Sequence, residues 1–196
     1  MLKFSTIAKL AATSLVTVLF GMSANAADRI SDFSLTDHEG RFFQLSRHAN
    51  QDAVVLLVYD AESRDARRAI SDLQDLEEKF AEQNVEFIAI NSSGSTDKIA
   101  MREEAADEDI TVRILMDDTQ LVAEELGLSR VAEVAILDPT SKEVVYRGAL
   151  NKSSAEGSRS ERNAGSYVEE ALNAILADQE VSANLVASKG DVITSA

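Results

Sequence analysis

The chain has few residues whose types and spacing could carry chemistry, and they form no complete catalytic set. It contains no cysteine, so it cannot supply a thiolate or form a disulfide itself. A serine nucleophile needs an adjacent base and an oxyanion hole, and no G-x-S-x-G surrounds Ser63. Both histidines, His38 and His48, lie in a predicted hairpin region before the first buried strand. We therefore interpret Ser63 as a helix N-cap, with Asp65 in the first turn.

Metal ligation is the next chemistry to consider. The two histidines are ten residues apart and have no cysteine partner, which does not match zinc spacing. Carboxylates cluster at 107–109 and 117–118, but without the alternating ligands and central glycine of a calcium loop. No glycine pattern typical of phosphate or dinucleotide binding occurs. We interpret the clusters as solvated surface charge and expect neither a metal nor a cofactor.

Three arginines, Arg64, Arg67 and Arg68, stand together directly after Ser63. They are unusual in a chain whose net charge is −15. Positive charge near a helix N-terminus opposes the helix dipole, so these residues contribute little to helix stability there. One interpretation is a polar docking surface that they form with Glu62. The alternative is that they are ordinary exposed side chains paired with neighbouring aspartates.

Changes of hydrophobic period predict the elements that position these residues. A continuous apolar run at 53–59 is typical of a strand buried on both faces, and two mostly apolar runs at 85–90 and 131–137 predict two further strands. Apolar residues three or four apart predict an amphipathic helix over 63–81, and a last helix follows Ser166. A hairpin over 32–45 precedes them, and an edge strand over 143–147 closes a second hairpin. Alternating strands and helices predict an α/β fold, a three-layer sandwich with a mixed central sheet flanked by helices.

The first 26 residues have the pattern of a secretory signal peptide. Two lysines accompany an apolar run over 10–20, and Ala24-Asn25-Ala26 supplies a small-residue cleavage signature. The run is too short to span a bilayer. We therefore expect cleavage after residue 26, a periplasmic protein without a membrane anchor, and one domain over 27–177. The sequence leaves the order of a C-terminal tail over 178–196 open.

Acidic residues outnumber basic ones by 34 to 19. Phosphate binding needs a basic surface, so this balance argues against nucleic acid as a partner and disfavours anionic lipid. High net charge is typical of a soluble protein. Without disulfides, stability must come from packing alone.

Short pieces of sequence in a fixed order span roughly residues 30 to 177. They are Asp32-Phe33-x-Leu35-x-Asp37-x-x-Gly40, Val54 to Val58, Val85-x-Phe87-Ile88-Ala89-Ile90-Asn91, Leu115 to Asp118, Leu126 to Leu128, Glu133 to Asp138, and Tyr146-Arg147-Gly148. In order and spacing they resemble the redoxin branch of the thioredoxin superfamily, which holds peroxiredoxins and exported thiol–disulfide proteins. The resemblance implies a thioredoxin-like fold.

Positions that carry redox chemistry in that family hold other residues here. In the family, a cysteine follows the buried strand at a helix N-terminus, where the dipole lowers the thiol pKa. Counted from Leu73 and Leu76, that position falls on Ser63, and the second cysteine of a CxxC pair falls on Ala66. Ala132 takes the place of the family's cis-proline. A cis bond before a non-proline residue costs about 2.5–4 kcal/mol, so we expect a trans peptide and a reshaped loop.

These departures lead to the hypothesis of a non-catalytic binding or accessory module of the cell envelope, with an envelope protein as its partner. Its contact surface is a predicted groove, whose residues are Glu62, Arg64, Arg67, Arg68, Val131 and Glu133. The alternative is the antioxidant or oxidoreductase role that family membership implies, with an activity that does not use a thiol. A third hypothesis is a stable relic with a structural role.

Overall fold

The structure is a computed structural model that describes residues 28–94, 97–158 and 165–193. The predicted signal peptide at 1–26 lies outside these residues. Within the described ranges, no helix has the length and apolar character needed to cross a membrane.

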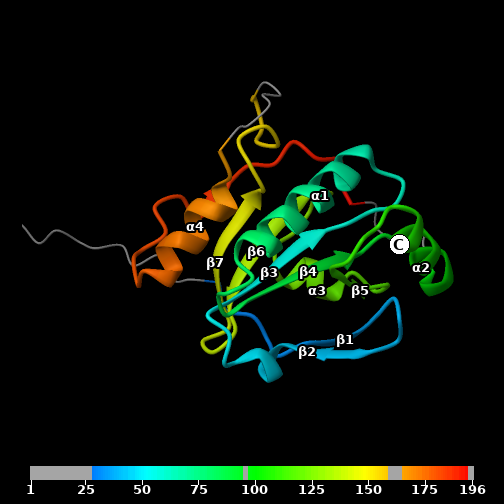
Figure 1. The fold of residues 1–196 in the computed structure, drawn as a ribbon, viewed down its shortest axis with the longest axis horizontal. Coiled ribbons are helices and arrows are strands. Elements are labelled where there is room, and N and C mark those ends of the chain that lie inside the picture. The colour runs from blue at the N-terminus through cyan, green and yellow to red at the C-terminus, as the bar shows by residue number, and fades with distance from the viewer. Residues whose placement is uncertain (1–27, 95–96, 159–164, 194–196) are drawn as a thin grey trace, which may run out of the picture.

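One mixed sheet of eight strands runs through the molecule (Figure 1), in the order β2-β1-β5-β4-β3-β6-β7-β8. The strands are β1 (Ser34–Asp37), β2 (Phe42–Gln44), β3 (Ala53–Val58), β4 (Val85–Asn91), β5 (Arg113–Met116), β6 (Glu133–Asp138), β7 (Glu143–Ala149) and β8 (Leu185–Val186). Strands β3, β4 and β5 are parallel, whereas β6 runs antiparallel to β3 and β7 runs antiparallel to β6. The mixed sheet and both predicted hairpins are confirmed.

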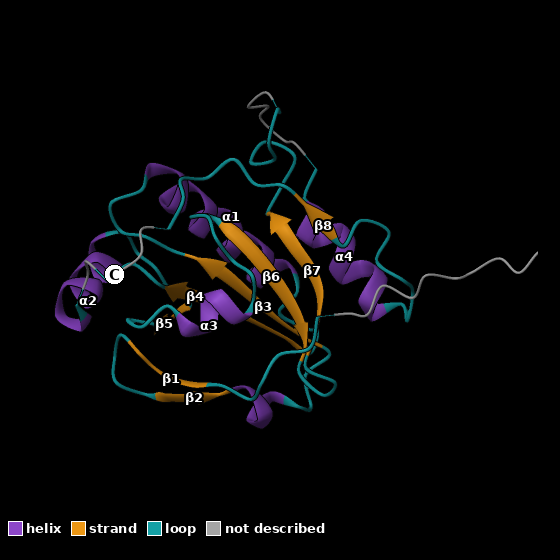
Figure 2. Ribbon diagram, turned by 180° about the vertical axis from the view of Figure 1, so that it is seen from behind, coloured by secondary structure: helices purple, strands orange, loops and turns teal. Residues whose placement is uncertain are grey.

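Helices cover both faces of this sheet. They are α1 (Arg64–Lys79), α2 (Lys98–Asp107), α3 (Leu121–Glu125) and α4 (Tyr167–Leu176), with a short 3-10 helix, η1 (Leu45–His48). Figure 1 shows α1 and α4 in front of the sheet, and the view from behind in Figure 2 shows α3 on the other face. The predicted three-layer α/β sandwich is therefore confirmed.

Strand β3 is the centre of the core because all six of its residues are buried. Alternate side chains point to opposite faces of a strand. Val55 and Leu57 therefore join the apolar cluster under α1, whereas Val54 and Leu56 join the cluster under α3. The continuous apolar run in the sequence reflects this burial on two faces. Because β3 ends where α1 is about to begin, the core fixes the start of that helix.

Two boundaries differ from those expected from the sequence. Strand β6 begins at Glu133 rather than Val131, because Ala132 adopts a left-handed backbone with φ of 61°. The chain also continues beyond residue 177 as part of the domain, with β8 parallel to β7. A side chain at Gly148 would place its Cβ 1.8 Å from the Val186 carbonyl oxygen, so glycine permits this pairing. The two-residue strand has too short a pattern to be recognised from sequence.

Candidate functional site

The start of α1 holds Ser63 and Ala66, the residues expected at the positions of the family's cysteine pair. Ser63 has an extended backbone and its hydroxyl accepts a hydrogen bond from the Ala66 amide at 3.3 Å, with Asp65 in the first turn. The predicted N-cap is confirmed. Ala66 is completely buried in the cluster between α1 and the sheet. Both positions thus serve the fold, one by capping the helix and one by packing beneath it.

Neither histidine reaches this helix start as a catalytic base. His38 is buried with its Nδ1 3.4 Å from the backbone of Ile114, and the His48 ring stacks on Phe43 at 4.6 Å between centroids. Both therefore belong to the region of β1, β2 and η1, as the sequence predicts. The described residues hold no group of three or more histidines, aspartates and glutamates suited to a metal.

Ala132 lies at the entrance to β6, in the place of the family's cis-proline. Its amide donates a hydrogen bond to the Val58 carbonyl, at the end of β3, at 2.9 Å. No cis peptide bond occurs in the described ranges, so the predicted trans peptide is confirmed. A proline has no amide hydrogen and a φ near −65°, so it could not take this conformation. The alanine therefore ties the reshaped loop to the sheet.

Val131 and Glu133 flank this alanine, and both side chains are buried, with 4% and 7% of their surface exposed. One carboxylate oxygen of Glu133 accepts hydrogen bonds from the amides of Ser129 (2.9 Å) and Arg130 (3.1 Å). The carboxylate thus organises the loop that precedes it. These two side chains are not part of an open groove, which corrects the contact surface expected from the sequence.

Arg67 is half-buried, with 38% of its side chain exposed, and lies against α2. Its Nη2 donates to the Ala61 carbonyl at 2.8 Å, and its guanidinium lies 3.7 Å from Glu104 and 3.8 Å from Glu108, both of α2. The Tyr59 hydroxyl donates to the same Glu104 at 2.9 Å, and burial together with this carboxylate raises the tyrosine pKa well above its ordinary value. Arg67 therefore connects α1 to α2.

The remaining members of the predicted surface are exposed. Glu62, Arg64 and Arg68 all face solvent at the start of α1. Arg68 forms a long ion pair of 3.5 Å with Asp65, and 69% of its side chain is exposed. Exposed pairs of this kind contribute at most about 1 kcal/mol. The three arginines thus have different surroundings: Arg67 contacts α2, whereas Arg64 and Arg68 lie on the surface.

The last described residues cover the loop at 129–131. We call residues 187–193 the C-terminal strap. The Val131 amide donates to the Asp191 carbonyl at 2.8 Å, and the Ile193 amide donates to the Ser129 carbonyl at 2.9 Å. Sequence reasoning missed this cover because its contacts are made by the main chain and need no recognisable side-chain pattern.

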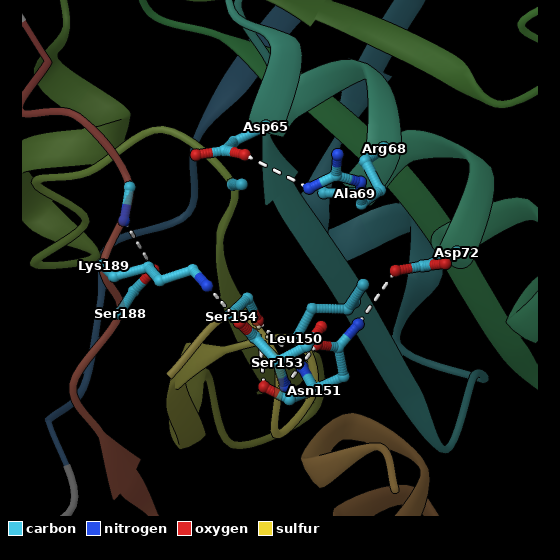
Figure 3. A pocket seen from close by; sticks show the side chains of 12 residues that line it. Asp65, Arg68, Ala69, Asp72, Leu150, Asn151, Ser153, Ser154, Ser188 and Lys189 are labelled. Atoms are coloured by element: carbon cyan, nitrogen blue, oxygen red, sulfur yellow. Dashed lines mark hydrogen bonds and ion pairs between the residues drawn. The ribbon is translucent and has the colours of Figure 1, made fainter. Parts of the chain in front are cut away.

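A small cavity remains between the strap, the first turns of α1 and Ala132 (Figure 3). Its volume is about 30 Å³, room for roughly two water molecules. Ligand pockets usually measure about 300–1,000 Å³. In the cavity wall, Asp72 accepts a hydrogen bond from Asn151 at 2.8 Å, and burial raises the Asp72 pKa. The cavity beside Ala132 is therefore too small for a peptide or a cofactor in this conformation.

The two kinds of arginine are expected to differ in their effect on stability. Arg67→Met removes the charged hydrogen bond to Ala61 and the contacts to α2, so it should lower the free energy of unfolding by about 1–2 kcal/mol. Arg64→Met and Arg68→Met should change it by less than about 0.5 kcal/mol. Urea unfolding followed by circular dichroism measures all three. Equal changes in unfolding free energy for all three variants would contradict the role of Arg67 in connecting α1 to α2.

Ala132→Pro, which restores the family residue, should destabilise this protein. It leaves the Val58 carbonyl unpaired and forces φ out of the left-handed region, so we expect a loss of at least about 2 kcal/mol. Ala132→Gly keeps the amide and tolerates the backbone, and should stay within about 1 kcal/mol of the wild type. Urea unfolding compares the two. A proline variant as stable as the glycine variant would contradict the role of the Ala132 amide.

Comparison with known proteins agrees with this architecture. A family model described as "AhpC/TSA family" matches residues 26–149, more than half of the chain. A search of curated proteins found no match.

Solved structures share the fold at low sequence identity. A hypothetical protein from Sinorhizobium meliloti 1021 is 20% identical, with a TM-score of 0.75, over 87% of this chain and 94% of its own. An uncharacterized conserved protein from Geobacillus kaustophilus is 21% identical, with a TM-score of 0.73, over 87% and 92%. The peroxidoxin BcpB from Mycobacterium tuberculosis is 21% identical, with a TM-score of 0.60, over 77% and 96%. Together with the family match, the fold shows that this cysteine-free chain belongs to the AhpC/TSA family and has a thioredoxin-like fold.

Proposed function

We propose that this protein is a non-catalytic binding module of the cell envelope. The observation that carries the proposal is that every redox position of the family has a structural use here. Ser63 caps α1, Ala66 packs under it, and the Ala132 amide bonds to β3. The fold is kept although the residues that react in the family are replaced. Binding of a partner at the surface around these positions is the function that such a fold still supports.

The start of α1 is the part of that surface from which binding is proposed. Glu62, Arg64 and Arg68 are exposed there, whereas Arg67 is half-buried and Val131 and Glu133 are buried. Arginine is enriched at protein interfaces because its planar guanidinium can form several hydrogen bonds, often in pairs to a carboxylate. Two exposed guanidinium groups on an otherwise acidic protein favour an acidic patch on a partner protein.

Envelope location rests on the sequence pattern of residues 1–26. Cleavage after Ala26 would remove two lysines and no acidic residue, which makes the exported protein still more acidic. The two exposed guanidinium groups of Arg64 and Arg68 then stand out further from their surroundings. The net negative charge of the protein repels an acidic partner at long range, and the two exposed arginines attract it only at short range. This arrangement favours specificity over a fast association rate.

The oxidoreductase alternative has less support from the geometry. The chain supplies no thiolate, the Ser63 hydroxyl caps a helix, and the adjacent cavity holds about 30 Å³. A peroxidase of this family depends on a thiolate that attacks the peroxide.

Affinity capture from the native envelope fraction tests the proposed surface. The cleaved protein, beginning at residue 27, serves as bait, and bound proteins are identified by mass spectrometry. Arg64→Glu or Arg68→Glu should reduce a specific partner at least about tenfold, a loss of about 1.4 kcal/mol. A negative charge at position 64, in the first turn of α1, favours the helix. Arg68→Glu places a like charge near Asp65, so circular dichroism must show that this variant is folded.

Arg47→Glu is the matched control for this capture. Arg47 is also exposed, but it lies on η1, away from the start of α1 (Figure 1), with its guanidinium 5.1 Å from the Phe42 ring centroid. This variant carries the same change of charge and should retain the partner. Capture that is unaffected by Arg64→Glu and Arg68→Glu, or reduced equally by Arg47→Glu, would contradict the proposal.

A further inference from the structure

The C-terminal strap forms main-chain hydrogen bonds with two separate segments. On one side it pairs with residues 129–131, through the bonds of Asp191 and Ile193 described above. On the other side the Lys189 amide donates to the Ser154 carbonyl at 3.0 Å, and the Glu156 amide donates to the Ala187 carbonyl at 2.8 Å. The strap therefore lies in a slot between these two segments, and backbone groups supply most of its contacts.

Gly190 is the point of closest approach between the strap and the slot. A Cβ at this position would lie 1.8 Å from the Val131 carbonyl oxygen, a distance that backbone atoms cannot accommodate. Arg130 closes over the same residue, because its Nη1 donates to the Gly190 carbonyl at 2.9 Å. The slot thus accepts an extended chain that has glycine at one defined position.

Two side-chain contacts hold the strap: Ile193 packs, half-buried, against the apolar cluster under α3, and the Lys189 ammonium donates to the Ser153 carbonyl. Lys189, Asp191 and Val192 are exposed, and 64% of the Val192 surface is accessible. Ser188 is buried, but it is small. Segments with few buried apolar contacts and surface main-chain bonds open at a small fraction of the global unfolding free energy. The strap is therefore suited to leave the slot while the rest of the fold stays intact.

We propose that the slot is a binding site for an extended polypeptide segment with glycine at the position of Gly190, and that the C-terminal strap is its built-in occupant. Main-chain pairing provides affinity in such sites, and local restrictions on side chains provide specificity. A partner segment binds by replacing the strap, whose attachment to the domain gives it a high effective concentration and makes it a competitor. The slot is formed by residues 129–131 and 154–156, and it adjoins Arg68 of α1 through the small cavity that this arginine lines together with the strap.

The full-length Gly190→Ala variant tests this proposal with purified components. The substitution should release the strap, so that the amides of Val131 and Ile193 lose protection against hydrogen exchange. A synthetic peptide of residues 184–193 should then bind, and the same peptide with alanine in place of Gly190 should bind at least about tenfold more weakly. Wild-type protein should also bind the peptide at least about tenfold more weakly, because its own strap competes. Isothermal titration calorimetry measures each affinity.

Two further variants keep the test decisive. Asp191→Ala alters an exposed neighbouring side chain but keeps the carbonyl that pairs with Val131, and should behave like the wild type. If Gly190→Ala does not fold, Ile193→Ala replaces it, because it removes the packing of the strap against the apolar cluster under α3 and leaves every slot residue unchanged. A folded variant with a released strap that does not bind the peptide at 1 mM would overturn the proposal. Equal binding of both peptides would also overturn it. Both results are independent of the envelope capture.

Discussion

The hydrogen bond from the Ala132 amide to the Val58 carbonyl, at 2.9 Å, is the contact on which the rest of this site depends. It joins the loop before β6 to the end of β3, close to the start of α1. The left-handed backbone of Ala132 allows the bond and turns residues 129–131 away from the sheet. A proline could form neither the bond nor the turn. Ser63 caps α1, and Ala132 ties the loop before β6 to β3. Both positions expected to carry redox groups in the family therefore have structural roles here.

Closure of the site follows from how its polar groups are used. Glu133 accepts amides of its own loop, Arg67 bonds to the Ala61 carbonyl beside α2, and Tyr59 bonds to Glu104. These side chains contribute contacts within the fold. What stays available is main chain and surface charge. Both proposed interactions use these, the first through exposed guanidinium groups at the start of α1 and the second through the backbone edge at 129–131.

The sequence was sufficient for the parts of this structure that depend on side-chain patterns. The apolar run of β3 and the amphipathic period of α1 predicted the layers, and the capping preference of serine predicted the role of Ser63. The parts that depend on the main chain were not predictable. The pairing of β8 and the strap involves amides and carbonyls, which every residue has. The only sequence features of this pairing are two single glycines, Gly148 and Gly190. Why glycine is required there is clear only once the carbonyl group facing each of them is known. Because the sequence does not reveal that the strap covers residues 129–131, it predicts an open groove at Val131 and Glu133.

The central claim, that the former redox site is closed by the chain's own backbone, is tested most directly by amide hydrogen exchange of the full-length wild-type protein, followed by NMR. Ala132 should exchange only on global unfolding, because its amide bonds to the buried end of β3. Val131 and Ile193 should share a lower but clear protection, roughly a hundredfold or more over free peptide, as expected when one strap opens as a unit. Exchange of the Val131 and Ile193 amides at free-peptide rates, in a protein whose Ala132 is protected, would show an open site and contradict the account.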